Sequence, residues 1–230
     1  MMEKKLIQKF RELLDEFNQN NCVEIIHRET NFPNHSESVR NRTFELFNKR
    51  YEYKIPENMK ELVSFPAKLY LHWKVRDSED PELIGEFCLQ NIINVLTLND
   101  RVDVTNEDID EDTKTLMRKA HYFDTQPEKS WTTSTVLIPE ENKNLPDIWL
   151  LDDLQLFKMN LSIEQYFDVL FLTKGMYYWQ YIFCDKAAYI DTSFYKKRYI
   201  MEMLKVLPEI FPSRDYSLLI ERFHEISDEP

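Results

Sequence analysis

The five histidines are the side chains of this sequence best suited to acid–base or metal chemistry. They form neither an H-E-x-x-H motif nor an H-x₃₋₅-H pair, the spacings that bring two imidazoles onto one metal ion. His72 and His121 both fall in predicted strands, so a sheet could bring them together. A pocket near His72 and His121 would suit a hydrolase or a small-ligand sensor, which we keep as an alternative function. A packed or surface histidine is the commoner role, and nothing in the spacing favours a catalytic residue.

A run of carboxylates between residues 99 and 114 is the other chemical feature, and we interpret it as a long acidic loop. Three of its aspartates alternate like the first ligands of a calcium loop. Thr113, however, stands where that loop needs glycine, and Lys119 stands where it needs a bidentate glutamate. We therefore expect no metal ion. Six of the carboxylates are candidates for contacting a protein partner: Asp103, Glu107, Asp108, Asp110, Glu111 and Asp112.

The composition restricts the partners. The formal net charge is −12, which predicts long-range repulsion from nucleic acid and from anionic membranes and attraction to a basic protein. Gly85 and Gly175 are the only two glycines, too few for the Gly-rich loops that cradle phosphates. We therefore expect no cofactor, no nucleic acid and no membrane among the ligands.

The cysteines and the N-terminus predict a cytoplasmic protein. Cys22, Cys88 and Cys184 are an odd, widely spaced set beside apolar residues, which favours buried free thiols over a disulfide framework. The first residues form a charged amphipathic pattern without the apolar run of a signal peptide.

The element that must organise the core is the apolar, aromatic stretch 160–185, interpreted as a central helix. Ser162 and Gln165 have the spacing of a capping box at its start. Apolar residues then follow at helical spacing and leave little of the circumference polar: Ile163, Tyr166, Phe167, Leu170 and Phe171. The aromatic residues after Gly175 are interpreted as further core.

The remaining elements predict an α+β fold. Helices are expected at 4–18 and 36–50, at about 56–65, and at 193–207 and 216–226. Runs with the period of strands occur at 69–75, 85–92, 118–124, 131–138, 148–151 and 154–159, while 93–98 fits a strand or a short helix. Short loops join most of these runs, which favours an antiparallel or mixed sheet flanked by helices, with extra helices at both ends of the chain. We expect a single domain over residues 1–230.

Four pieces of the sequence resemble the SUKH superfamily, which includes bacterial immunity proteins and proteins similar to fungal glucan-synthesis regulators. They cover about residues 50–185: the I-P-E-N-M-K-E-L start at 55–62, L-H-W at 71–73, A-H-Y-F-D at 120–124, and K-G-M-Y-Y-W-Q at 174–180. The Asn-Gly turn usual in the family is replaced here by S-F-P-A at 64–67. The resemblance makes 51–190 a SUKH-like core between N- and C-terminal helical extensions, 1–50 and 191–230.

The resemblance implies a non-catalytic protein-binding module, an immunity protein that neutralises a co-encoded toxin effector. It supplies no catalytic residue. The acidic composition would suit masking the basic face of a toxin domain. A regulatory scaffold that uses the C-terminal helices is a further alternative.

Overall fold

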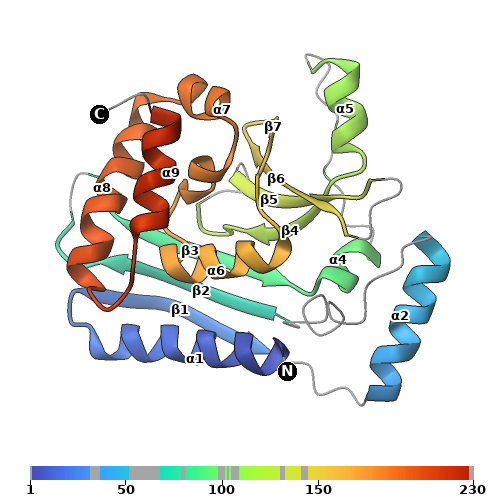
Figure 1. Cartoon of the computed structure of the whole chain (residues 1–230), viewed down its shortest axis with the longest axis horizontal. Helices are drawn as coiled ribbons and strands as arrows, with labels where there is room; N and C mark the ends of the chain where they lie inside the picture. Colours follow the sequence, from blue (N-terminus) through green and yellow to red (C-terminus); the bar gives the residue numbers. More distant parts are fainter. Residues whose placement is uncertain are drawn as a thin grey trace. The chain divides into compact units, whose positions relative to one another are not determined.

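The computed structural model describes residues 2–31, 37–51, 68–78, 81–97, 102, 104, 109–129, 133–140 and 145–227. The helix expected at 56–65 lies outside these residues. The described elements are, in order, α1 (Met2–Gln19), β1 (Val23–Asn31), α2 (Glu37–Tyr51), β2 (Lys68–Val75), β3 (Ile84–Gln90), α4 (Ile92–Thr97), α5 (Glu111–Met117), β4 (His121–Thr125), β5 (Thr133–Ile138), β6 (Asp147–Asp152), β7 (Gln155–Lys158), α6 (Ile163–Thr173), the 3₁₀ helix η2 (Trp179–Phe183), α7 (Lys186–Asp191), α8 (Phe194–Ile210) and α9 (Ser217–Ser227) (Figure 1).

The strands form one seven-stranded antiparallel sheet in which each strand pairs with its neighbour in sequence, from β1 to β7. β5 and β6 pair along their length, from Thr133 opposite Asp152 to Ile138 opposite Asp147. This strand order is that of an antiparallel meander, with helices inserted between β1 and β2 and between β3 and β4. The predicted α+β class, with helices flanking a sheet, is confirmed.

The chain divides into two compact units with interleaved segments. One contains Met1–Lys4, Glu29–Tyr70 and Cys88–Leu156, and the other contains Lys5–Arg28, Leu71–Phe87 and Phe157–Pro230. We call them the first and the second unit. The prediction of a single domain with two extensions stays a prediction. A hydrophobic cluster of the first unit consists of Val102, Met117, Ala120, Val136, Ile138 and Leu151.

The core of the second unit joins the N-terminal helix to the C-terminal half of the chain. Of the apolar positions expected on one face of α1, Leu6, Phe10, Leu13 and Phe17 are buried and Leu14 is half-buried. The Phe10 ring lies 6.5 Å from that of Phe87 and 6.0 Å from that of Phe171, measured between centroids. Nearer the C-terminal end of α1, Phe17 packs edge-on against Trp73 and Phe211. Edge-to-face aromatic pairs of this kind add to the burial of apolar area.

The central helix is shorter than predicted. Its capping box is present, because the Ser162 hydroxyl accepts from the Gln165 N–H and the Gln165 side chain accepts from the Ser162 N–H. However, α6 ends at Thr173 and does not run to 185. Lys174 and Gly175 both have left-handed backbones, with φ of 59° and 68°, and the Gly175 N–H closes the helix on the Leu170 carbonyl. This glycine-associated C-terminus stops the helix before the aromatic run.

Three smaller expectations are wrong. Cys22 is exposed, although Cys88 and Cys184 are buried free thiols as predicted. Residues 111–117, whose acidic first part was expected to lie in a loop, form α5. Leu46, one of the apolar positions expected to pack in the helix at 36–50, is 61% exposed.

Candidate functional site

The acidic residues predicted to bind a partner fall in two groups. Asp103, Glu107 and Asp108 lie outside the described residues. Asp110, Glu111 and Asp112 are exposed at the start of α5.

The described carboxylates of this group also have local structural roles. Asp110 is the N-cap of α5, and its carboxylate accepts from the Thr113 N–H at 2.9 Å. The contacts with Thr113 hold the pKa of Asp110 below its ordinary value of 3.8, so this carboxyl stays charged. Glu111 pairs with Lys114 at 3.0 Å and with Arg118 at 3.8 Å. Part of the negative charge is therefore compensated within the helix.

The two histidines considered for a pocket are both buried. His72 of β2 is 8% exposed, and His121 of β4 is 3% exposed. They belong to different compact units. No group of three or more His, Cys, Asp or Glu that could hold a metal ion occurs among the described residues.

Cys88 is likewise poorly suited to act as a nucleophile. Burial first, and then the charge of Asp124, raise the pKa of the Cys88 thiol from 9.0 to about 11. Since the thiolate is the reactive form, this thiol is inert at neutral pH.

The most unusual charged group is one that the sequence did not indicate, the ammonium of Lys174. Its side chain is fully buried, and its Nζ lies 2.7 Å from the Glu16 carboxylate of α1. The same Nζ donates to the Phe171 carbonyl at 3.2 Å and lies 4.8 Å from the centre of the Phe211 ring. Burial lowers the pKa of Lys174, while the hydrogen bond and charge of Glu16 oppose that shift.

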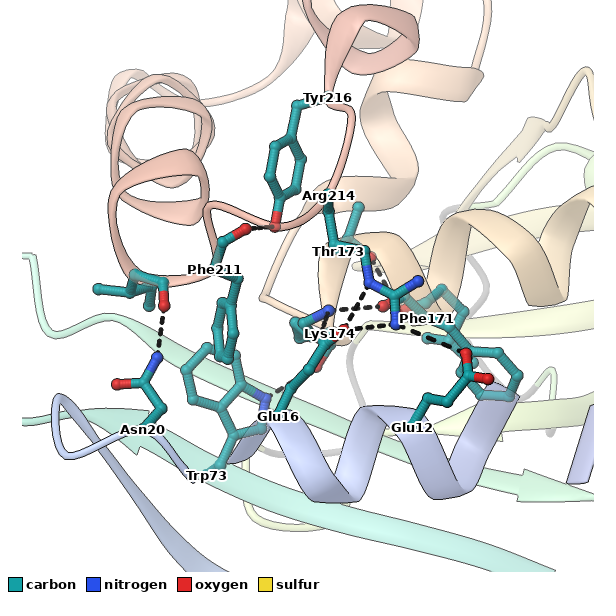
Figure 2. A network of polar contacts seen from close by, with 12 residues as sticks. Glu12, Glu16, Asn20, Trp73, Phe171, Thr173, Lys174, Phe211, Arg214 and Tyr216 are labelled. Atoms are coloured by element: carbon teal, nitrogen blue, oxygen red, sulfur yellow. Dashed lines mark hydrogen bonds and ion pairs between the residues drawn. The ribbon is translucent and has the colours of Figure 1, made fainter. Parts of the chain in front are cut away.

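Arg214, in the loop between α8 and α9, completes this network (Figure 2). Its guanidinium donates from Nε to Glu16 at 2.6 Å and also makes an ion pair with Glu16 through Nη2. Glu12, one turn earlier on α1, is 4.0 Å from Arg214. One carboxylate therefore pairs with two cations, and it connects α1 to the end of α6 and to the α8–α9 loop.

The backbone of Lys174 is fixed as well as its side chain. The Lys174 ammonium is enclosed on all sides, so a substrate has no access to it. The Lys174 carbonyl accepts from the buried Trp73 indole N–H at 2.8 Å, which fixes the same residue from its backbone. Removal of one partner of a buried ion pair is strongly destabilising, because it leaves the other charge buried and unpaired.

The K-G-M-Y-Y-W-Q segment has a structural role as well. It pairs with β3 through an isolated antiparallel bridge, in which Met176 lies opposite Gly85. The Glu86 N–H donates to the Gly175 carbonyl at 2.8 Å, and the Tyr177 N–H donates to the Ile84 carbonyl at 3.1 Å.

The chain's two glycines lie at this bridge, Gly85 in β3 and Gly175 next to Met176. A Cβ on Gly175 would stand 2.6 Å from the Phe87 ring, and one on Gly85 would overlap the Trp73 indole. Gly175 therefore lets its segment approach the β3 backbone closely, and Gly85 leaves room for the Trp73 indole.

The aromatic residues of the segment are core, as predicted. Tyr177, Tyr178, Trp179 and Tyr181 are all buried. The Tyr177 hydroxyl donates to the buried Glu86 carboxylate at 3.1 Å.

A groove of about 460 Å³ lies between α6 and α9 in the second unit. Leu161, Val169, Phe183 and Leu218 supply its apolar lining. Its polar lining residues have partners within the protein: Asn160 bonds Asp185, Gln165 bonds Ser162, Asp168 pairs with Lys9, and Arg222 pairs with Glu225.

Comparisons of the chain with protein-family models, with curated proteins and with solved structures gave no match. Within the part of the chain that the structure describes, no helix combines the length and the apolar character needed to cross a bilayer.

Proposed function

We propose that this chain is a cytoplasmic, non-catalytic protein-binding module of the immunity type, which neutralises a basic toxin effector by covering its basic face. The observation that carries the proposal is the row of exposed carboxylates Asp110, Glu111 and Asp112 at the start of α5, on a chain with a net charge of −12. Complementary charge of this kind accelerates encounter and selects basic partners.

The remaining chemistry of the described residues is consistent with binding without catalysis. Lys174 and Arg214 both pair with Glu16. His72 and His121 are buried, and the thiol of Cys88 is protonated at neutral pH. The identity of the partner as a co-encoded toxin rests on the resemblance of 174–180 and the other segments to the SUKH superfamily.

Growth rescue tests this proposal. A host that expresses the product of the neighbouring gene alone should stop growing, and co-expression of the chain should restore growth. Arrest that persists while the chain is expressed and folded would argue against neutralisation.

The same assay separates binding from the hydrolase alternative. His72→Gln and His121→Gln should rescue growth as well as the wild type does. Loss of rescue in either variant, with an unchanged melting temperature, would favour a reaction that uses the histidine.

A further inference from the structure

The exposed apolar side chains of the second unit include a group at the junction of α7 and α8. Phe194 is 81% exposed, the largest exposed fraction of any large hydrophobic side chain that the structure describes. Tyr195 is 52% exposed and Ile190 is 50% exposed. A single exposed hydrophobic residue needs no explanation, but three within six residues of chain mark an interaction surface.

The charge of this segment is opposite to that of the whole chain. Residues 186–198 contain four cations and one aspartate, a net charge of +3, within a chain of net charge −12. We call the following set the α7–α8 patch: Lys186, Ile190, Phe194, Tyr195, Lys196, Lys197 and Arg198.

Two of the cations lie over buried tyrosine rings of the same unit. The Lys196 ammonium lies 5.7 Å from the centre of the Tyr178 ring, and the Lys197 ammonium lies 5.5 Å from that of Tyr189. Lys197 also donates to the Ile190 carbonyl at 2.6 Å. Arg198 follows Phe194 by four residues, so the two share one face of α8.

The dipole of α8 does not favour these cations. Its first turn has no acidic residue, and cations near a helix N-terminus are unfavourable because that end of the helix is positive. A nearby anionic surface would offset this unfavourable interaction.

We propose that the α7–α8 patch docks the protein on an anionic membrane surface. Phe194 and Ile190 would enter the apolar boundary, the amphipathic Tyr195 ring would lie among the headgroups, and the Lys and Arg side chains would contact lipid phosphates. Three of the four cations are lysines, which are depleted at protein–protein interfaces and are typical of membrane-binding basic segments.

The net charge of −12 does not prevent this docking. Charges are screened beyond a Debye length of about 8 Å at physiological ionic strength. The membrane therefore interacts chiefly with the local +3 segment and its exposed apolar side chains. This docking is independent of the proposed toxin binding.

Sedimentation with vesicles tests the proposal. The full chain is mixed with vesicles of phosphatidylcholine alone, or of phosphatidylcholine with phosphatidylserine, and the bound fraction is measured at low and high salt. We expect binding to the anionic vesicles to exceed binding to the neutral ones and to fall with salt. Phe194→Ala should weaken binding about tenfold, and Arg198→Gln and Lys186→Gln about fivefold each.

Two control variants test whether the effect is confined to the α7–α8 patch. Leu46→Ala removes an exposed apolar side chain elsewhere, and Lys205→Gln removes an exposed cation further along α8, so neither should change binding. Equal sedimentation with both kinds of vesicle, or unchanged binding of Phe194→Ala, overturns the proposal. Binding to soluble polyglutamate without binding to vesicles also overturns it and assigns the patch to an acidic protein partner.

Discussion

The Lys174 ammonium and the Glu16 carboxylate form a 2.7 Å ion pair in which the lysine side chain is fully buried. Glu16 also binds Arg214, so a single carboxylate of α1 fixes two cations from the C-terminal half of the chain. The N-terminal helix is therefore an integral part of the second unit, together with α6, α8 and α9.

Replacement of Glu16 by glutamine should destabilise the fold strongly. It leaves Lys174 buried with an unpaired charge, and breaking a buried pair from one side costs about 3–5 kcal/mol. The free energy of unfolding in urea measures this loss. Glu12→Gln is the matched control: this residue is 4.0 Å from Arg214, its side chain is 46% exposed, and we expect a loss below about 1 kcal/mol.

A second replacement should recover part of that loss. In the Glu16→Gln, Lys174→Met double variant the buried charge is gone, and a hydrophobic side chain of similar length fills its place. We expect the double variant to be more stable than Glu16→Gln alone. Additive losses in the double-mutant cycle would contradict the coupling of the two residues.

The stability contributed by Lys174 should depend on pH. Burial lowers the pKa of Lys174 in the folded protein below its ordinary value of 10.5. Between that lowered value and 10.5, the unfolded chain binds a proton that the folded chain has released, so the free energy of unfolding rises with pH. The destabilisation by the buried charge is thus complete below the lowered pKa and is relieved as the pH approaches 10.5.

Urea unfolding at neutral and alkaline pH measures this effect against Lys174→Met. The stability of the wild type should rise relative to the variant as the pH increases. A difference between the two proteins that is the same at every pH would mean that Lys174 titrates normally.

Alanine should not be accepted at either glycine. Gly85→Ala directs a methyl group into the fully buried Trp73 indole, and we expect a loss of about 3 kcal/mol or more. Gly175→Ala places a methyl group close to the Phe87 ring, on a residue whose left-handed backbone at φ 68° is strained for alanine. We expect a loss of about 2 kcal/mol in the free energy of unfolding. Thermal or urea unfolding measures both. Stability within about 0.5 kcal/mol of the wild type for Gly85→Ala would show that the Trp73 indole does not lie against Gly85 as described.

The hydroxyl of Tyr199 should contribute measurably to stability. It donates to the Ile84 carbonyl at 2.6 Å and accepts from the Ile84 N–H at 2.5 Å, just where β3 meets the segment after α6. Tyr199→Phe leaves both backbone groups without this partner, so we expect a loss of about 1–3 kcal/mol in urea unfolding. Tyr195→Phe, on an exposed ring of the same helix, should be close to neutral.

Local patterns in the sequence predicted most of the elements, because helical and strand periods report burial directly. The stripe of α1 and the capping box of Ser162 and Gln165 are examples. The end of α6 was missed since the apolar pattern continues past Thr173, while the chain itself turns at Lys174 and Gly175. α5 does have a local signal, because Asp110 is its N-cap and two acidic residues follow in the first turn. The same carboxylates also fit a charged loop, which is what the sequence was taken to indicate.

The buried network had no such signal. Glu16, Lys174 and Arg214 lie in three distant parts of the sequence, and each looks like an ordinary surface charge in its own neighbourhood. Only the tertiary fold brings them together, so no spacing rule for a single helix or strand could have identified them.

Titration calorimetry of the purified product of the neighbouring gene into the chain, at low and high salt, tests the proposed function most directly. We predict a complex whose affinity falls as salt rises. We also predict that Asp110→Asn, Glu111→Gln and Asp112→Asn together weaken the complex and flatten its salt dependence, while Glu209→Gln on α8 leaves it unchanged. The absence of a complex would contradict the proposed function, and an affinity independent of salt would contradict its electrostatic basis.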